Sequence, residues 1–329
     1  MSFEIRNESL TDKDDFGGVK LSDLVVIDST AYETLFEEGQ YPNIHWENTH
    51  SSKVSFKGSK LSGWFKSSTF LDSNFDQTEL SNLKMYDCTH NRSKLSNIES
   101  SEMVLNNTTL HNSHIIDSEI KGIEVYNSKF ENITCISSEM NDGYFTDLFA
   151  VRFYLSLTKV IDTNLIFKNS DDVNFVKCEV SDGSYISGLG LNWFISNTEF
   201  SNTALMDLEL HYPKVENTSF IMCNWKRCEV TDGHFSGSNI SQTTWFKTKI
   251  ESNFINFTFD RLTTFDVQAK LNCQRVVFKD CTFRGVDFRG SRFSLVTFEN
   301  CTFDTSCKLQ GVDLRGATLI KTNVPDSIK

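Results

Sequence analysis

FKDCTFRGVDFRGSRF, residues 278–293, places phenylalanine at 278, 283, 288 and 293, always five residues apart. Side chains return to the same face about every 3.6 residues in an α-helix and about every 2 residues in a strand, so neither element explains this interval. The stretch therefore indicates a repeating backbone that is neither a helix nor a simple strand.

The five-residue interval runs through most of the chain. At every fifth position from 65 to 255, 35 of 39 residues are apolar, whereas the 39% hydrophobic composition predicts about 15. The exceptions are His90, Ser100, Ser170 and Gly190. After slips of one residue, the interval also covers 26–61 upstream and 278–324 downstream. An internal repeat of this length is typical of a solenoid. Only residues 256–277 lose the interval, and we expect an irregular stretch there.

A small residue lies two positions before many of the large apolar ones, as at Ser68, Thr108 and Thr198, and the other three positions are mostly polar. Units such as CTFRG (281–285), VDFRG (286–290), VDLRG (312–316) and SNFDQ (73–77) resemble the unit of the pentapeptide-repeat family. That unit is a small residue, Asn or Asp, Leu or Phe, and two polar residues. The resemblance covers roughly residues 21–324 and is far more specific for fold than for function.

The resemblance implies an all-β fold, a right-handed quadrilateral β-helix in a single elongated rod. Four units make a coil of 20 residues, so residues 26–324 give about 15 coils. The large and the small residue point inward, and stacked coils bury a continuous apolar column. We expect an acidic N-terminal segment or cap at 1–25 and a short tail at 325–329. The expected core includes Phe278, Phe283, Phe288, Phe293, Phe298 and Phe303.

The cysteines and the N-terminal residues indicate in which cellular compartment the protein lies. Eight of the nine cysteines fall at inward positions, and Cys273 lies in the stretch that loses the interval. An odd number of cysteines without a CxxC motif fits a reducing compartment. No secretory signal and no apolar run long enough to span a membrane is visible. We expect a cytoplasmic protein without a membrane span, and secretion by a non-classical route stays open.

The net charge is −12 and is unevenly distributed: −8 in residues 1–50 and +3 in residues 256–329. Contacts with phosphates require Lys and Arg, so we expect no direct binding of nucleic acid. An acidic chain instead suits a basic protein surface, although ordinary solubility explains the same charge.

Two segments are candidate partner-binding surfaces. Phe149, Val151, Leu189 and Leu191 fall at positions that should face solvent. Either the local register shifts and these side chains fill the core, or they form an apolar surface that binds a partner. The acidic N-terminal region, with Glu37 and Glu38, either caps the solenoid or contacts a partner.

No catalytic motif, glycine-rich phosphate loop or set of metal ligands is visible, and we expect a non-enzymatic protein without a cofactor. One hypothesis is an acidic DNA mimic. Some pentapeptide-repeat proteins, those of the quinolone-resistance type, are similar in shape to B-DNA and engage DNA gyrase, a type II topoisomerase. The alternatives are a protein-binding scaffold of a secreted bacterial effector that contacts a host protein, and a structural spacer. Stacked rows of Asp and Glu along one face would favour the DNA mimic.

Overall fold

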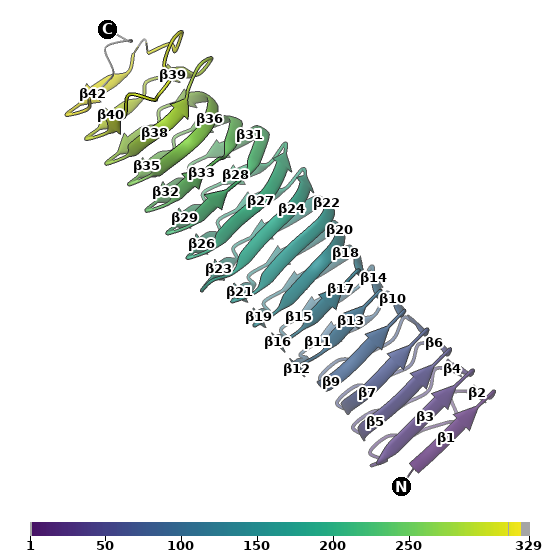
Figure 1. Cartoon of the computed structure of the whole chain (residues 1–329). Helices are drawn as coiled ribbons and strands as arrows, with labels where there is room; N and C mark the ends of the chain where they lie inside the picture. Colours follow the sequence, from purple (N-terminus) through teal and green to yellow (C-terminus); the bar gives the residue numbers. More distant parts are fainter. Residues whose placement is uncertain (1, 315, 324–329) are drawn as a thin grey trace. The chain divides into compact units, whose positions relative to one another are not determined.

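The computed structural model describes residues 2–314 and 316–323, and these residues form strands without any helix. The chain divides into two compact units, Met1–Asn169 (unit 1) and Ser170–Lys329 (unit 2). Each unit is a parallel β-solenoid in which the chain climbs from coil to coil (Figure 1). Together the units contain about 16 turns, in agreement with the expected quadrilateral β-helix of about 15 coils.

The strands are short and follow the chain in order. Unit 1 contains β1 (Ser2–Arg6), β2 (Ser9–Leu10), β3 (Asp23–Ile27), β4 (Thr30–Tyr32), β5 (Gln40–Glu47), β6 (His50–Ser52), β7 (Lys60–Lys66), β8 (Thr69–Leu71), β9 (Glu79–Tyr86), β10 (Thr89–Asn91), β11 (Lys94–Ser96), β12 (Glu99–Ser101), β13 (Val104–Asn106), β14 (Thr109–His111), β15 (His114–Ile116), β16 (Glu119–Lys121), β17 (Glu124–Tyr126), β18 (Lys129–Ile136), β19 (Glu139–Asn141), β20 (Tyr144–Ser156) and β21 (Lys159–Ile161). Strand β22 (Asn164–Val176) includes the unit boundary. Unit 2 contains β23 (Glu179–Ser181), β24 (Tyr185–Leu191), β25 (Phe194–Ser196), β26 (Glu199–Ser201), β27 (Ala204–His211), β28 (Lys214–Glu216), β29 (Ser219–Ile221), β30 (Asn224–Lys226), β31 (Glu229–Ser236), β32 (Asn239–Ser241), β33 (Thr244–Phe246), β34 (Lys249–Ile255), β35 (Thr258–Asp260), β36 (Thr263–Gln274), β37 (Val277–Lys279), β38 (Thr282–Asp287), β39 (Arg292–Ser294), β40 (Thr297–Glu299), β41 (Thr302–Phe303) and β42 (Thr318–Ile320).

Neighbouring coils pair in register, about twenty residues apart. In unit 1, His90 on β10 lies opposite Phe70 on β8 and Leu110 on β14. In unit 2, Phe220 on β29 lies between Phe200 and Ile240. Because strands in a sheet lie about 4.8 Å apart, side chains at equivalent positions form continuous rows.

The large residue of each unit points inward and stacks on its equivalent in the next coil. The rings of Phe278 and Phe298 are parallel, with centroids 4.8 Å apart, and those of Phe283 and Phe303 are 4.6 Å apart. All six phenylalanines from 278 to 303 at this interval are buried. Stacked aromatic pairs of this kind add to the stabilisation from burial alone.

The small inward residue also bonds the coils together. The Thr108 hydroxyl donates to the Met85 carbonyl of the preceding coil at 3.3 Å, and the Thr108 backbone amide donates to the Ser128 hydroxyl of the following coil at 3.1 Å. A hydroxyl at this position therefore satisfies polar groups that would otherwise be buried without partners. This pairing explains why Ser and Thr recur beside the apolar column.

The corners of the coils require the left-handed backbone conformation. Asn107, Asp142 and Asn202 occupy corners with φ values of 51°, 53° and 49°. Asn, Asp and Gly adopt this conformation more readily than other residues do. The frequent Asn and Asp at the polar positions of the repeat are thus explained by corner geometry.

The stretch 256–277 is not irregular, contrary to the sequence-based expectation. It contains β35 and β36, and β36 pairs in parallel with β34 and β38. The five-residue interval is shifted because two of the repeats contain four residues instead of five, one from Ile250 to Phe254 and one from Ala269 to Cys273. Ile250 therefore lies opposite Ala269 on the next coil. In addition, Thr264 and Ala269 take the place of large apolar residues.

The predicted N-terminal cap, residues 1–25, contains paired strand: β1 pairs with β3 in register, and Ile5 and Leu10 are buried. Its role as a cap stays a prediction. The tail at 325–329 lies outside the described residues. Among the residues that the structure describes, no helix is long and apolar enough to cross a membrane.

Candidate functional site

Phe149 and Val151, two of the sequence-predicted partner residues, lie on the outer wall of unit 1. They flank the inward Ala150 on β20, and Ala150 pairs in register with Phe130. The alternative in which the local register shifts and these two side chains fill the core is therefore wrong. The Phe149 side chain is 38% exposed, and the Lys168 ammonium lies 5.2 Å from its ring centroid.

Leu189 and Leu191 lie on β24 in unit 2 and are half-buried outward residues. The pairing of β24 with β27 is interrupted between Ile186 and Gly188, and it resumes with Gly188 opposite Leu208 and continues with Gly190 opposite Leu210. The bulge therefore leaves the two leucines on the outer wall. The structure does not place them in the core.

An exchange of large and small residues explains why the column of unit 2 tolerates Ser170 and Gly190. Trp193 occupies a small inward position, is buried, and donates from Nε1 to the Ser170 hydroxyl at 2.9 Å. The Ser170 hydroxyl in turn donates to the Leu189 carbonyl at 2.9 Å. One indole thus fills the space that two large apolar side chains would occupy elsewhere in the solenoid.

Replacing Gly190 by alanine should therefore destabilise unit 2. A Cβ atom at Gly190 would lie 2.5 Å from Trp193 Nε1 and 2.7 Å from Leu210 Cδ2. Overpacking of this kind costs about 1–3 kcal/mol. Urea denaturation of Gly190→Ala, followed by far-UV circular dichroism, measures the effect. The Trp193→Leu background is the control, because relief of the clash there should recover part of the loss.

Glu37 and Glu38, the other sequence-predicted partner residues, lie at a corner of unit 1. Glu37 is half-buried and accepts a hydrogen bond from the Ser55 hydroxyl at 2.5 Å. Glu38 is exposed and has the left-handed φ of 55°. Both residues have a role in the corner itself, so their charge alone does not mark them as a binding surface.

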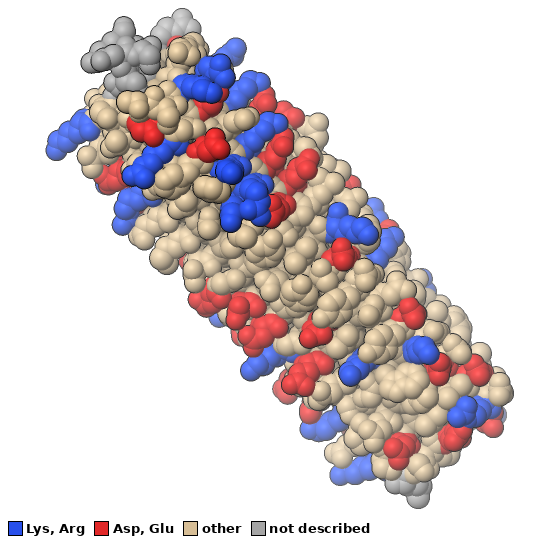
Figure 2. All heavy atoms as spheres, viewed as in Figure 1, with Lys and Arg blue, Asp and Glu red and all other residues tan. Residues whose placement is uncertain are grey.

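A row of glutamates that the sequence analysis missed lies on another wall of unit 1. Glu79, Glu99, Glu119 and Glu139 occupy the same position in four successive coils and pair in register through β9, β12, β16 and β19. We call these four residues the glutamate ladder. In Figure 2, acidic side chains gather along the edge where β12, β16 and β19 lie in Figure 1.

The inner members of the glutamate ladder lack basic partners. Lys60 neutralises Glu79 at one end, and the Asn141 amide donates to Glu139 at 2.5 Å at the other. Within the described residues, Glu99 and Glu119 form no ion pair, and both are exposed. Directly opposed like charges on adjacent strands are destabilising. The ladder thus places like charges side by side at its two inner positions, and lysines lie next to it at both ends.

The surroundings reinforce this negative field. Residues 97–147 contain nine acidic and two basic residues, and unit 1 as a whole contains 25 acidic and 15 basic residues, a net charge of −10. Unit 2 accounts for the remaining −2. Sorting the outward residues by a 20-residue period, as the repeat implies, would have revealed the ladder from the sequence.

His90, another exception to the apolar interval, is fully buried in the column of unit 1. Its ring stacks on Phe70 with centroids 4.7 Å apart, and Phe75 lies 5.7 Å away. Neither ring nitrogen has a hydrogen-bond partner within the described structure. Burial lowers the pKa of His90 from 6.5 to about 4, because the protonated ring would be desolvated without a counter-charge.

Stability should therefore fall in mild acid. The unfolded chain takes up a proton at His90 near pH 6.5 and the folded chain only near pH 4, so the unfolded state binds more protons in this interval. The folded state loses up to about 3 kcal/mol as the pH falls from 6.5 to 4. Urea midpoints measured across this range should show the loss, and His90→Phe should flatten it. Equal slopes for the two proteins would contradict the assignment to His90.

Within the described ranges, no group of three or more His, Cys, Asp or Glu side chains is placed to hold a metal ion. All nine cysteines are buried. Burial raises the pKa of Cys88, Cys223 and Cys228 to about 11, so these thiols are protonated at neutral pH. That the chain is not an enzyme stays a prediction.

The repeat is the feature that this chain shares with known proteins. A family model described as pentapeptide repeats (9 copies) matches residues 272–318. Among curated proteins, no sequence matches this chain significantly.

Three solved structures illustrate the similarity. The chain is 14% identical to QnrB1, a plasmid-mediated fluoroquinolone resistance protein, over 96% of this chain and 92% of that one, with a TM-score of 0.19. It is 11% identical to HetL, a pentapeptide-repeat protein involved in heterocyst differentiation regulation from the cyanobacterium Nostoc, over 99% and 92%, with a TM-score of 0.16. It is 7% identical to a PL6 alginate lyase, over 99% and 91%, with a TM-score of 0.28. Similarity at this level transfers no function.

Residues 272–318 thus match pentapeptide repeats, and the five-residue pattern of inward side chains continues through both units. The chain resembles the pentapeptide-repeat family in this repeat.

Proposed function

We propose that the chain is a non-enzymatic recognition protein whose glutamate ladder binds a basic protein surface. The partner class we favour is a protein with a surface that normally binds DNA, such as a type II topoisomerase. The observation that carries this proposal is the in-register stacking of Glu99 and Glu119, exposed and without an ion pair in the described structure.

The electrostatic argument has two parts. Stacked carboxylates repel each other, so a row of them lowers the stability of the fold, and a bound basic surface would relieve this repulsion. Their summed field attracts a surface rich in Lys and Arg and accelerates its association. Ladder carboxylates recur about every 4.8 Å, compared with one phosphate about every 3.4 Å along a DNA strand. The ladder thus offers a DNA-like row of charge at somewhat lower density.

A gyrase supercoiling assay, titrated with the purified full-length chain at two salt concentrations, tests this function. We expect inhibition at micromolar protein that weakens at the higher salt, because screening reduces interactions between exposed charges. The assay needs a control with a neutral protein of similar size at the same concentrations. The absence of inhibition at either salt would remove gyrase as a partner.

The second candidate is a protein-binding scaffold that uses the outer wall around Phe149 and Val151. The 38% exposure of the Phe149 side chain favours it, since the pattern of the repeat calls for a polar residue there. A photo-crosslinking residue at position 149, with one at the exposed position Lys159 on another wall of unit 1 as control, would identify a protein bound at this wall. Crosslinks of equal yield at both positions would contradict the scaffold.

The state of the cysteines is the basis on which we propose a cytoplasmic location. Nine buried cysteines, an odd number without a CxxC motif, suit a reducing compartment.

A further inference from the structure

The shortened repeats leave a notch at one corner of unit 2. Asp232 on β31 occupies this corner with a left-handed φ of 54°, and Gly290 occupies it three coils further along with a φ of 82°. In the two coils between them the corner residue is missing. Asp232 has no counterpart where β31 pairs with β34, and β34 then pairs with β36 in unbroken register through Glu251 and Lys270. The corner is therefore cut back over the width of two coils.

The notch continues into a second hollow on the neighbouring wall. The notch has a volume of about 250 Å³, and the second hollow has a volume of about 310 Å³. Both are lined by Glu251 and Lys270, so they adjoin each other. The further polar residues are Asp232, Asn253, Asn272 and Arg292 in the notch, and Gln268, Asp287 and Arg289 in the second hollow.

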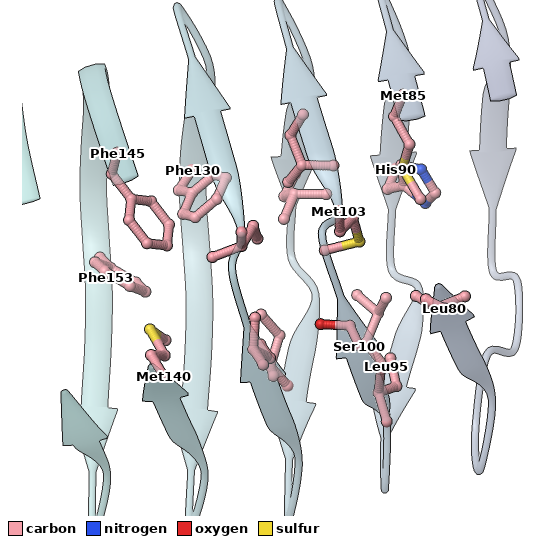
Figure 3. Close-up of a pocket in the computed structure, with 16 residues that line it drawn as sticks. Leu80, Met85, His90, Leu95, Ser100, Met103, Phe130, Met140, Phe145 and Phe153 are labelled. Atoms are coloured by element: carbon pink, nitrogen blue, oxygen red, sulfur yellow. The ribbon is translucent and has the colours of Figure 1, made fainter. Parts of the chain in front are cut away.

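The interior of the solenoid differs from this surface. The cavity in the core of unit 1 has a volume of about 40 Å³, and its surface is apolar, with Leu95, Met103 and Phe145 among its lining side chains (Figure 3). A ligand that requires hydrogen bonds would lose them there. The notch, in contrast, offers polar side chains at the surface of the protein.

The polar side chains of the notch alternate between acceptors and donors. Asp232 and Arg292 are exposed and form no ion pair or side-chain hydrogen bond within the described residues. Between their coils, Asn272 donates from Nδ2 to Asn253 Oδ1 at 2.9 Å. This bond leaves the amide group of Asn253 as a donor and the side-chain carbonyl of Asn272 as an acceptor. From coil to coil the order is thus carboxylate, amide N–H, amide carbonyl and guanidinium.

We propose that the notch and the second hollow bind a saccharide of two or more sugar units. A hydroxyl group both donates and accepts hydrogen bonds, so the hydroxyls of a sugar match an alternating row of acceptors and donors. The two hollows hold successive sugar rings, and the ion pair between Lys270 and Glu251 lies where the rings are joined. This site lies in unit 2 and is independent of the glutamate ladder.

Other classes of ligand fit the charges of the notch less well. Asp232 and Glu251 balance Lys270 and Arg292, so the lining of the notch has no net charge and favours a neutral ligand. A phosphate or carboxylate ligand would approach both acidic side chains, and an apolar ligand would desolvate all four charged groups. In the part of the chain that the structure describes, no set of three His, Cys, Asp or Glu side chains is placed to hold a metal ion.

A glycan array carrying neutral, acidic and sulfated oligosaccharides, probed with the labelled full-length chain, tests the site. Isothermal titration calorimetry then measures the affinity for the neutral oligosaccharide that binds best. In the double variant Asp232→Gly, Arg292→Ala this affinity should fall at least about tenfold, because hydrogen bonds to charged groups are stronger than those between neutral groups. Glycine suits the left-handed corner, so the variant should keep the native far-UV circular dichroism.

A second variant restores the missing corners. One asparagine inserted after Glu251 and one after Lys270 give both shortened repeats five residues, which fills the notch and should abolish binding. The matched control Asp182→Gly, Arg284→Ala removes the same charges from unit 2 outside both hollows, and it should bind normally. The proposal would be overturned by no binding to any oligosaccharide, by binding confined to acidic or sulfated ones, or by undiminished affinity in the folded Asp232→Gly, Arg292→Ala variant.

Discussion

Phe283→Asp should leave unit 2 unfolded, whereas Arg284→Asp, one residue away, should cost less than about 1 kcal/mol. Phe283 is 1% exposed, and its ring centroid lies 5.5 Å from that of Phe288 and 4.6 Å from that of Phe303. Loss of a buried phenylalanine costs about 3–5 kcal/mol, and an aspartate there adds an unpaired buried charge. The sum approaches the whole stability of a typical domain, about 5–15 kcal/mol.

Arg284 is the matched control because its side chain faces solvent. Its guanidinium lies 5.4 Å from the Phe265 ring centroid, a contact worth about 0.5–1 kcal/mol at an exposed site. Hydrogen exchange measured by mass spectrometry should show lost protection in unit 2 for Phe283→Asp and native protection for Arg284→Asp. If both variants kept native protection, the inward orientation of Phe283 would be wrong.

The sequence predicted the coil because its interior is constrained. Inward positions hold apolar side chains in almost every coil. The five-residue interval of apolar residues therefore predicts which side chains point inward, as it does for the phenylalanines from Phe278 to Phe303. The prediction was wrong at 256–277, where four-residue units move the interval and small residues such as Thr264 weaken the pattern. Composition alone cannot distinguish a shortened unit from a loop.

The candidate site was harder to predict, because outward positions are free to vary. Exposed apolar residues such as Phe149 attract attention by residue type, whereas a glutamate is ordinary at any solvent-facing position. The significance of Glu99 and Glu119 comes from their alignment across coils, which depends on the register of the strands. Likewise, the exchange between Gly190 and Trp193 involves two different positions of the repeat, and only the packed structure reveals it.

Reversing the two inner charges of the glutamate ladder should abolish most of the binding to a basic partner without harming the fold. The double variant Glu99→Lys, Glu119→Lys changes the local charge by four units at the centre of the row. Electrostatic attraction alters association rates by about 10-fold or more, so the gyrase inhibition should weaken at least about tenfold. Lysine fits this row, since Lys159 occupies the next position after Glu139. The change turns the 79/99 and 119/139 pairs into opposite charges and keeps one like-charge pair, between the two lysines at 99 and 119, so the urea midpoint should be unchanged or slightly raised.

The matched control is Asp87→Lys, Asp147→Lys, which changes the net charge of unit 1 equally at a corner away from the ladder. Both aspartates have left-handed φ values, 55° and 51°, and lysine occupies such corners in this chain at Lys53 and Lys177. If the ladder is the binding surface, this control should retain most of the inhibition. Equal losses in both double variants would mean that net charge, rather than the stacked row, determines binding. Full inhibition by the ladder variant would place the contact on another wall.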